Sequence, residues 1–318
     1  MVGRLTRRPP RVLGRWGRPS GEPGPVLICV GGLHGNEPTG VGACGRVVAE
    51  LERLAPEARG RLVALAGNRG ALDGGERYLD RDLNRMWSDG ELARAGEPGG
   101  PRERAELAEL SAAIEAEVAA AQGEVVILDL HSTSAPGAPF CILASGGRSE
   151  ELASCFGVPV LVGLRGTVPG TLVEYYGCRG VPALCVEGGE NGTPDTAAHH
   201  EAAVWVLLAA LGVVDPALAG VAGHRDRLLA SALGLPGIVR VSYRHELEDG
   251  EVFEMVPGFE NFSPVAANTL LGTSSRGGGT EVRAPFDGLL VMPRYQGQGE
   301  DGFFLGTEDA ERAGEPPG

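Results

Sequence analysis

The sequence contains no lysine, so all 28 of its basic residues are arginines. This absence excludes lipoate and biotin, which attach to a lysine amine, and a P-loop nucleotide site, which needs a lysine. The 42 acidic residues outnumber the arginines and give a formal net charge of −14 at pH 7. Such a balance argues against nucleic-acid binding, because a protein binds the phosphates of a nucleic acid through a stripe of basic side chains. The arginines from Arg4 to Arg18 are interpreted as flanking an ordinary first strand.

Long apolar runs are also missing. Apolar residues make up 42% of the 318 residues, but no run approaches the roughly 20 that a membrane span needs. The six cysteines include no C-x-x-C pair, and several lie in strand-like apolar runs, as Cys29 does. We interpret them as buried thiols of a reducing compartment. We therefore expect a soluble cytoplasmic protein without membrane contact.

Apolar runs alternate with helical patterns over the first two thirds of the chain. The runs predict strands over residues 25–30, 61–66, 125–130, 140–144, 158–162 and 183–186. Helical spacing predicts helices over residues 38–54, 103–121 and 196–211, with an irregular stretch over 67–100. The helix over 103–121 is expected to be exposed, because it is rich in Ala and Glu. Alternating strands and helices predict an α/β fold with a mixed sheet covered on both faces.

The pattern changes near Leu235 to short alternating segments broken by Gly and Pro. Segments of this kind are typical of a small all-β domain. We therefore expect an α/β domain over residues 1–232 and a β-rich C-terminal domain over residues 233–318.

The first predicted strand runs into a polar turn that contains His34 and Glu37. By itself this pair is a weak signal, because a solvated histidine beside a helix N-terminal glutamate explains it equally well. A later strand, however, brings His131 to the point where its apolar run stops. Carboxyl ends of strands meet at one edge of an α/β sheet. Two histidines and one carboxylate, with a position left open for water, make a catalytic zinc pattern.

Three further parts of the sequence contain residues that can assist catalysis or substrate binding beside such a site. Asp129 shares a strand face with His131 and is expected to hold its ring. The irregular stretch contains several arginines, which can clamp a carboxylate or polarise a carbonyl oxygen. The alternative for that stretch is a surface loop joined by Arg–Asp pairs. Glu187 follows a short apolar run and can pass a proton from water to a leaving amine, unless it is a solvated strand-end residue.

Together these motifs resemble the succinylglutamate desuccinylase and aspartoacylase family, which is related to the zinc carboxypeptidases. The resemblance rests on His-Gly-Asn-Glu at 34–37, Asp-Leu-Asn-Arg at 82–85, Leu-Asp-Leu-His at 128–131 and Glu187, in the expected order. It implies a carboxypeptidase-like α/β/α catalytic domain. It also implies a β-rich C-terminal domain that narrows the entrance to the site.

The resemblance further implies a role for each matching residue. His34, Glu37 and His131 would bind one Zn²⁺ per chain, and Glu187 would be the general base and acid. Arg77 would help the metal to stabilise the tetrahedral oxyanion.

Substrate-binding roles follow from the same resemblance. Asn84 and Arg85 would hold the carboxylate of the substrate amino acid, and Asn68 would line the site. The predicted activity is zinc-dependent hydrolysis of the amide bond of a small N-acyl amino acid. Aspartoacylases also resemble one another in a Tyr and an Arg for a second carboxylate. No arginine aligns there in this chain, which leaves Arg165 and Arg179 as possible substitutes. Neither N-acetylaspartate nor succinylglutamate is established as the substrate.

Two alternatives to a deacylase remain at this stage. A metallocarboxypeptidase acting on small peptides would use the same zinc ligands, but the short gap from His131 to Glu187 and a C-terminal β domain argue against it. A non-catalytic zinc-containing binder of acyl-amino acids would need neither Glu187 nor the arginines. The acyl group, the amino acid, the metal loaded in the cell and the oligomeric state, including a homo-oligomer, stay open.

Overall fold

The computed structural model describes residues 8–95, 97–143, 146–218 and 220–309. Its core is a mixed sheet of eleven strands in the order β1-β3-β2-β4-β7-β5-β6-β8-β14-β13-β10. Strands from the first two thirds of the chain are β1 (Val12–Gly17), β2 (Val26–Gly31), β3 (Arg61–Ala66), β4 (Val125–Thr133), β5 (Phe140–Leu143), β6 (Val160–Val162) and β7 (Ala183–Glu190). β2 pairs in parallel with β3 and β4, and β4 pairs in parallel with β7.

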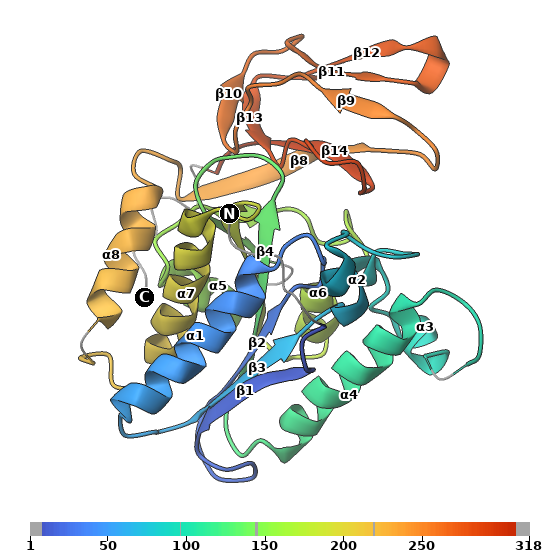
Figure 1. Ribbon diagram of the computed structural model, residues 1–318. Helices are drawn as coiled ribbons and strands as arrows, with labels where there is room; N and C mark the ends of the chain where they lie inside the picture. The colour runs from blue at the N-terminus through green and yellow to red at the C-terminus, as the bar shows by residue number, and fades with distance from the viewer. Residues whose placement is uncertain (1–7, 96, 144–145, 219, 310–318) are drawn as a thin grey trace.

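Helices cover both faces of this part of the sheet (Figure 1). The described helices are α1 (Thr39–Leu54), α2 (Arg69–Gly74), α3 (Asp89–Ala93), α4 (Glu103–Ala120), α5 (Arg148–Ser154), α6 (Leu172–Gly177), α7 (Pro194–Ala210) and α8 (Val221–Ser231), with the 3-10 helices η1 (Leu83–Arg85) and η2 (Arg276–Gly278). α1, α5, α7 and α8 share one apolar core on one face, whereas α4 and α6 share another on the opposite face. Burial on both faces explains why β2 and β3 are continuous apolar runs.

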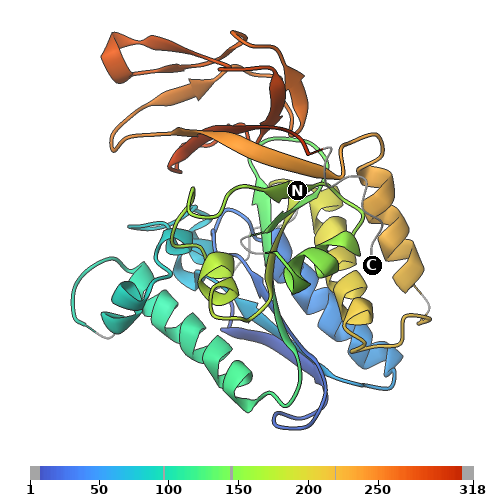
Figure 2. The same ribbon diagram turned by 180° about the vertical axis from the view of Figure 1, so that it is seen from behind.

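The C-terminal strands extend the same sheet and add a second one. β8 (Ile238–Glu246) pairs in parallel with β6, and β14 (Asp301–Glu308), β13 (Gly288–Val291) and β10 (Ser263–Val265) follow it. A separate antiparallel sheet is formed by β12 (Thr280–Arg283), β11 (Leu270–Ser274) and β9 (Phe253–Met255). Figures 1 and 2 show these strands at the end of the molecule towards which β4 points. The expected boundary after residue 232 falls between α8 and β8, and the division into two domains stays a prediction.

The predicted fold class is confirmed, and so are the predicted strands and helices. Of the strand predicted over 140–144, Ala144 lies outside the described residues. The stretch over 67–100, predicted to be irregular, instead contains the short helices α2, η1 and α3. Each begins at a side chain that caps it, namely Asn68, Asp82 and Ser88. Helices of so few residues show no apolar period that the sequence could reveal.

The predicted exposure of α4 is wrong for one of its faces. Leu107, Leu110 and Ile114 pack into the core, and buried carboxylates on the same helix meet arginines from neighbouring segments. Glu117, for example, lies 2.9 Å from the guanidinium of Arg61. A buried glutamate is tolerated where such a partner is present.

The sequence also predicted buried thiols and no membrane span. The six cysteines are free, four of them are buried, and Cys178 is exposed, so the prediction of buried thiols holds for most of them. Within the described ranges, no helix combines the length and apolar character that a membrane span needs.

A pair of glycines sets how closely α1 packs against the end of β2. A Cβ atom on Gly31 would lie 2.6 Å from the backbone of Gly40 and Val41. A Cβ atom on Gly40 would lie 2.8 Å from the side chain of Leu130. Only glycine permits this approach, which fixes the loop between β2 and α1.

We expect Gly31→Ala to lower the free energy of unfolding by about 1–3 kcal/mol, because the new methyl group overpacks this contact. Gly45→Ala on α1 is the matched control, because a Cβ atom there meets nothing within 4 Å. It should be neutral or stabilise by up to about 1 kcal/mol through helix propensity. Chemical denaturation measures both variants, and equal effects would contradict the packing argument.

Candidate active site

Three parallel strands end at the same edge of the sheet, and each brings predicted site residues there. His34 and Glu37 lie in the loop after β2, His131 lies near the end of β4, and Glu187 lies on β7 directly opposite His131. All four side chains are buried, with at most 7% of each residue exposed. The strand-end placement expected from the sequence is therefore found.

The two histidine rings turn the same nitrogen toward each other. Nδ1 of His34 and Nδ1 of His131 lie 3.2 Å apart. Each also faces one oxygen of Glu37, at 2.9 Å for His34 and 3.0 Å for His131. The backbone N–H of Ser132 donates to the Glu37 oxygen that faces His131. The ligand atoms of His34, Glu37 and His131 all lie within 4.8 Å of one another and could hold a metal ion.

The other nitrogen of each ring meets a buried carboxylate. Asp129 Oδ2 lies 2.9 Å from His131 Nε2, which matches the expected pairing along β4. Asp82 Oδ1 lies 3.1 Å from His34 Nε2, a contact that the sequence analysis missed. Histidines that bind metals usually donate their second N–H to a carboxylate, so an acidic partner for His34 could have been sought in the same motif as Asn84.

The carboxylates give this group of side chains a negative field that favours a cation. Burial opposes a lower pKa for Glu37, but His34 and His131 hold the pKa of Glu37 well below its ordinary value. Asp129 and Glu37 likewise raise the pKa of His131 well above its ordinary value against the effect of burial.

Glu187 has the features of a proton carrier. One of its carboxylate oxygens, Oε2, is buried and accepts no hydrogen bond from any described residue. Burial raises the pKa of Glu187 to about 7; the charge of Glu37 adds to this, whereas His131, His34 and Arg77 oppose it. A carboxyl group with such a pKa can both take and give a proton near neutral pH.

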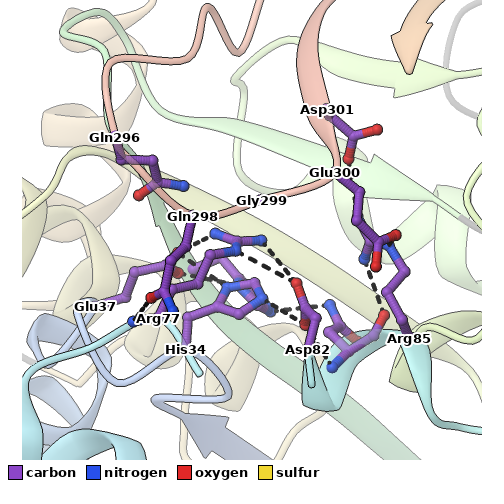
Figure 3. Close-up of polar contacts among 12 residues, drawn as sticks. His34, Glu37, Arg77, Asp82, Arg85, Gln296, Gln298, Gly299, Glu300 and Asp301 are labelled. Atoms are coloured by element: carbon purple, nitrogen blue, oxygen red, sulfur yellow. Dashed lines mark hydrogen bonds and ion pairs between the residues drawn. The ribbon is translucent and has the colours of Figure 1, made fainter. Parts of the chain in front are cut away.

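Arg77 lies beside the histidines, where it contacts two of the buried carboxylates. Its guanidinium is 3.2 Å from Glu37 and 3.3 Å from Asp82 (Figure 3). Its backbone carbonyl accepts a hydrogen bond from Gly35, in the loop that carries His34. Arg77 therefore lies close to the predicted metal ligands, as expected.

A buried glutamate supports the loop that carries Arg77. Glu103, at the start of α4, is fully buried and accepts hydrogen bonds from the backbone N–H groups of Leu79, Asp80 and Arg81. Its carboxylate also accepts a hydrogen bond from Asn68, which caps α2. Asn68 is fully buried and is not among the residues that line the cavity, and its role beside the substrate stays a prediction.

The motif that contains Asn84 and Arg85 reaches the cavity. The Asn84 side chain accepts a hydrogen bond from the backbone N–H of Leu172 and lies 3.5 Å from His131. Arg85 pairs with Asp301 at 2.9 Å and lies 3.4 Å from Glu300, two acids that the sequence analysis did not single out. Glu300 ends the loop between β13 and β14, and Asp301 begins β14. This loop runs across the site in Figure 3.

The site opens into a cavity of about 150 Å³ that is lined by all the predicted metal-binding and catalytic residues. An apolar wall of the cavity is formed by residues of one apolar cluster, namely Ile142, Leu164, Val168, Met292 and Phe304. The lining also includes Leu143, Val173 and Cys185. Arg165 lines the cavity, whereas Arg179 lies elsewhere, stacked on Tyr175 and paired with Asp89. Of the two arginines suggested as partners for a second carboxylate of the substrate, only Arg165 therefore lines the cavity.

Comparisons with known proteins agree with this geometry. Residues 23–209 match the model of the succinylglutamate desuccinylase/aspartoacylase catalytic domain. A succinylglutamate desuccinylase from Burkholderia pseudomallei is 34% identical over 107 residues, which are 34% of this chain and 30% of that protein. The human N-acyl-aromatic-L-amino acid amidohydrolase (carboxylate-forming) is 34% identical over 117 residues, 36% of this chain and 35% of that protein. The chain thus matches about a third of the length of these curated relatives.

Solved structures share the fold over most of the chain. A succinylglutamate desuccinylase/aspartoacylase from Rhodobacter sphaeroides has a TM-score of 0.65 at 19% identity, covering 91% of this chain and 87% of that one. The product-bound ectoine utilization protein EutE (DoeB) from Ruegeria pomeroyi has a TM-score of 0.63 at 20% identity, with coverage of 90% and 86%. The family model spans more than half of the chain, and the chain belongs to the succinylglutamate desuccinylase/aspartoacylase family.

Proposed function

We propose that this chain is a zinc-dependent deacylase that hydrolyses the amide bond of an N-acyl amino acid. The observation that carries the proposal is a buried His34–Glu37–His131 group that faces Glu187, whose free carboxylate oxygen is also buried. A binding protein needs no such proton carrier. Membership of a family of deacylases supports the same reaction class.

The residues present fit a zinc ion. Two imidazole nitrogens and one carboxylate converge, and a carboxylate holds the far nitrogen of each ring, as catalytic zinc sites require. When bound, zinc supplies a positive charge that polarises a carbonyl oxygen and acidifies water.

Glu187 would carry the proton in this reaction. Its free Oε2 atom accepts a proton from the attacking water, and the protonated carboxyl group then donates it to the leaving nitrogen. Arg77, fixed by Glu37 and Asp82, has its guanidinium at the cavity and would stabilise the negative charge that develops on the carbonyl oxygen.

The cavity supports a small substrate with one carboxylate and one apolar group. Arg85 offers a guanidinium for the carboxylate of the amino acid. The apolar wall, with Leu164, Val168 and Phe304, would favour an apolar acyl group or side chain over a second carboxylate. The loop between β13 and β14 lines the cavity through Gln296 and Gly299, which leaves little room for a long peptide.

The first experiment is hydrolysis of a panel of acetyl-, succinyl- and formyl-amino acids by zinc-loaded protein, with a chelated sample as control. We expect chelator-sensitive release of the free amino acid, strongest for members of the panel with apolar side chains.

Glu187→Gln should reduce turnover by about 10²–10⁴-fold, because the glutamine side chain cannot carry the proton. Zinc should remain bound to this variant; full turnover by zinc-loaded Glu187→Gln would sink the assignment.

Removing the carboxylate behind His34 should weaken zinc binding. Asp82→Asn is expected to lower zinc affinity by about 10–100-fold, because the ring loses its charged hydrogen-bond acceptor. Asp80→Asn is the matched control, because Asp80 lies in the same loop but pairs with Arg102 at the surface. Competition with a chromophoric chelator measures both. Equal affinities in the two variants would remove Asp82 from the zinc site.

The predicted carboxylate clamp can be tested by comparing acids with amides. Arg85→Gln should cost on the order of 2–5 kcal/mol in kcat/KM on N-acyl amino acids, because a desolvated charge pair is lost. Their primary amides should lose much less. Arg81→Gln is the control, since Arg81 pairs with Glu91 away from the cavity. Losses of the same size on acids and amides would contradict a carboxylate-binding role.

A further inference from the structure

The arginine assigned to the substrate carboxylate already faces carboxylates of the protein. Asp301 Oδ2 lies 2.9 Å from Nη2 of Arg85, and Glu300 Oε2 lies 3.4 Å from Nε (Figure 3). These two nitrogens form one edge of the guanidinium, the edge that binds a carboxylate bidentately. The third nitrogen, Nη1, donates to the backbone carbonyl of Asn84. Nε itself donates no hydrogen bond to a described residue. A substrate carboxylate can therefore take that edge only by displacing Asp301 from Nη2 and moving Glu300 away from Nε.

Asp301 has a second arginine partner that would remain after such a displacement. Its Oδ1 atom lies 2.5 Å from Nε of Arg244 on β8. Arg244 also donates to the backbone carbonyl of Thr167, so its position does not depend on Asp301 alone. The side chains of Arg85, Arg244 and Asp301 are only 10–17% exposed. An unpaired carboxylate would be costly in such a place, and Arg244 removes that cost.

The loop between β13 and β14, which leads into the two acids, is held by uncharged contacts as well. Gln298 accepts a hydrogen bond from the backbone N–H of Arg77 and donates to the carbonyl of Tyr78. Gln296 accepts a hydrogen bond from the side chain of Asn36 (Figure 3). These contacts should keep the loop in place when Arg85 changes partner. Glu300, whose side chain is 46% exposed, can turn to water.

We propose that Asp301, assisted by Glu300, is an internal competitor for the substrate carboxylate and thereby sets the affinity of the site for free acids. In the free enzyme Asp301 bridges Arg85 and Arg244. When an N-acyl amino acid binds, Arg85 transfers its Nη2 donor from Asp301 to the substrate, the free Nε donor binds the same carboxylate, and Asp301 stays on Arg244. The inference rests on the proposed function, in which Arg85 holds the substrate.

This exchange discriminates between ligands by charge. A substrate carboxylate replaces the ion pair that it breaks with one of the same kind, in a place with little water. A neutral amide has no charge with which to do so. Asp301 therefore lowers the affinity for every acid but leaves the binding of the matching amide almost unaffected. It is a specificity-determining residue that takes no part in the bond-breaking step.

The test measures binding without turnover. Zinc-loaded Glu187→Gln, alone and combined with Asp301→Asn, is titrated calorimetrically with N-acetyl-L-phenylalanine and with its primary amide. We expect Asp301→Asn to lower the Kd of the acid by about three- to tenfold, the range for losing a partly exposed competing charge. The Kd of the amide should change by less than about twofold.

Glu246→Gln is the matched control. Glu246 pairs across the strands with Asp301 and lies 3.1 Å from the same Arg244, but it does not contact Arg85. If the gain came only from removing a negative charge nearby, Glu246→Gln would tighten binding of the acid as much as Asp301→Asn. Equal gains in both variants would overturn the proposal. So would unchanged or weaker binding of the acid by Asp301→Asn, including no detectable binding.

Arg244→Gln gives a second prediction of opposite sign. Without Arg244, displaced Asp301 would have no partner, so the Kd of the acid should rise while that of the amide changes little. This variant keeps the proposal testable should Asp301→Asn fold poorly, which thermal melting reveals. Tighter binding of the acid by Arg244→Gln would count against the exchange. Failure of the proposed function would be seen separately, as no hydrolysis by the wild-type protein of any member of the panel.

Discussion

The active site depends on two buried carboxylates that orient two histidine rings. Asp82 and Asp129 hold Nε2 of His34 and of His131, which leaves both Nδ1 atoms directed at Glu37. If either carboxylate were absent, the ring could rotate and the three ligand atoms would no longer converge. The buried negative charge of the three acids is tolerable only beside cations; Arg77 is one, and the proposed zinc ion would be another.

This constraint links distant parts of the chain. Asp82 lies in a loop whose backbone is tied to the buried carboxylate of Glu103. The same loop carries Arg77, whose backbone N–H donates to Gln298 in the loop between β13 and β14. Hydrogen bonds therefore join the loop that carries Arg77 and Asp82 both to His34 and to the loop between β13 and β14. A change in the loop between β13 and β14 reaches the site through Arg77 and Arg85.

Membership of the family and the lining of the cavity bear on different questions. The family model covers the strands and loops that supply the metal group, which supports the reaction class. The choice of substrate would depend on cavity-lining residues outside those motifs, here apolar side chains, and on an arginine whose charge is balanced by Asp301. A deacylase for an apolar N-acyl amino acid is consistent with both.

The sequence by itself determined the sheet, the strand-end positions of His34 and His131, and the family, because apolar runs that stop at polar residues are local signals. Contacts between distant residues were decided only by the tertiary structure. His34 and Asp82 are 48 positions apart, and Arg85 and Asp301 are 216 apart. The capping role of Asn68 was equally hidden, since a short helix shows no period. Local patterns specify which elements form, whereas the folded chain decides which charges become partners.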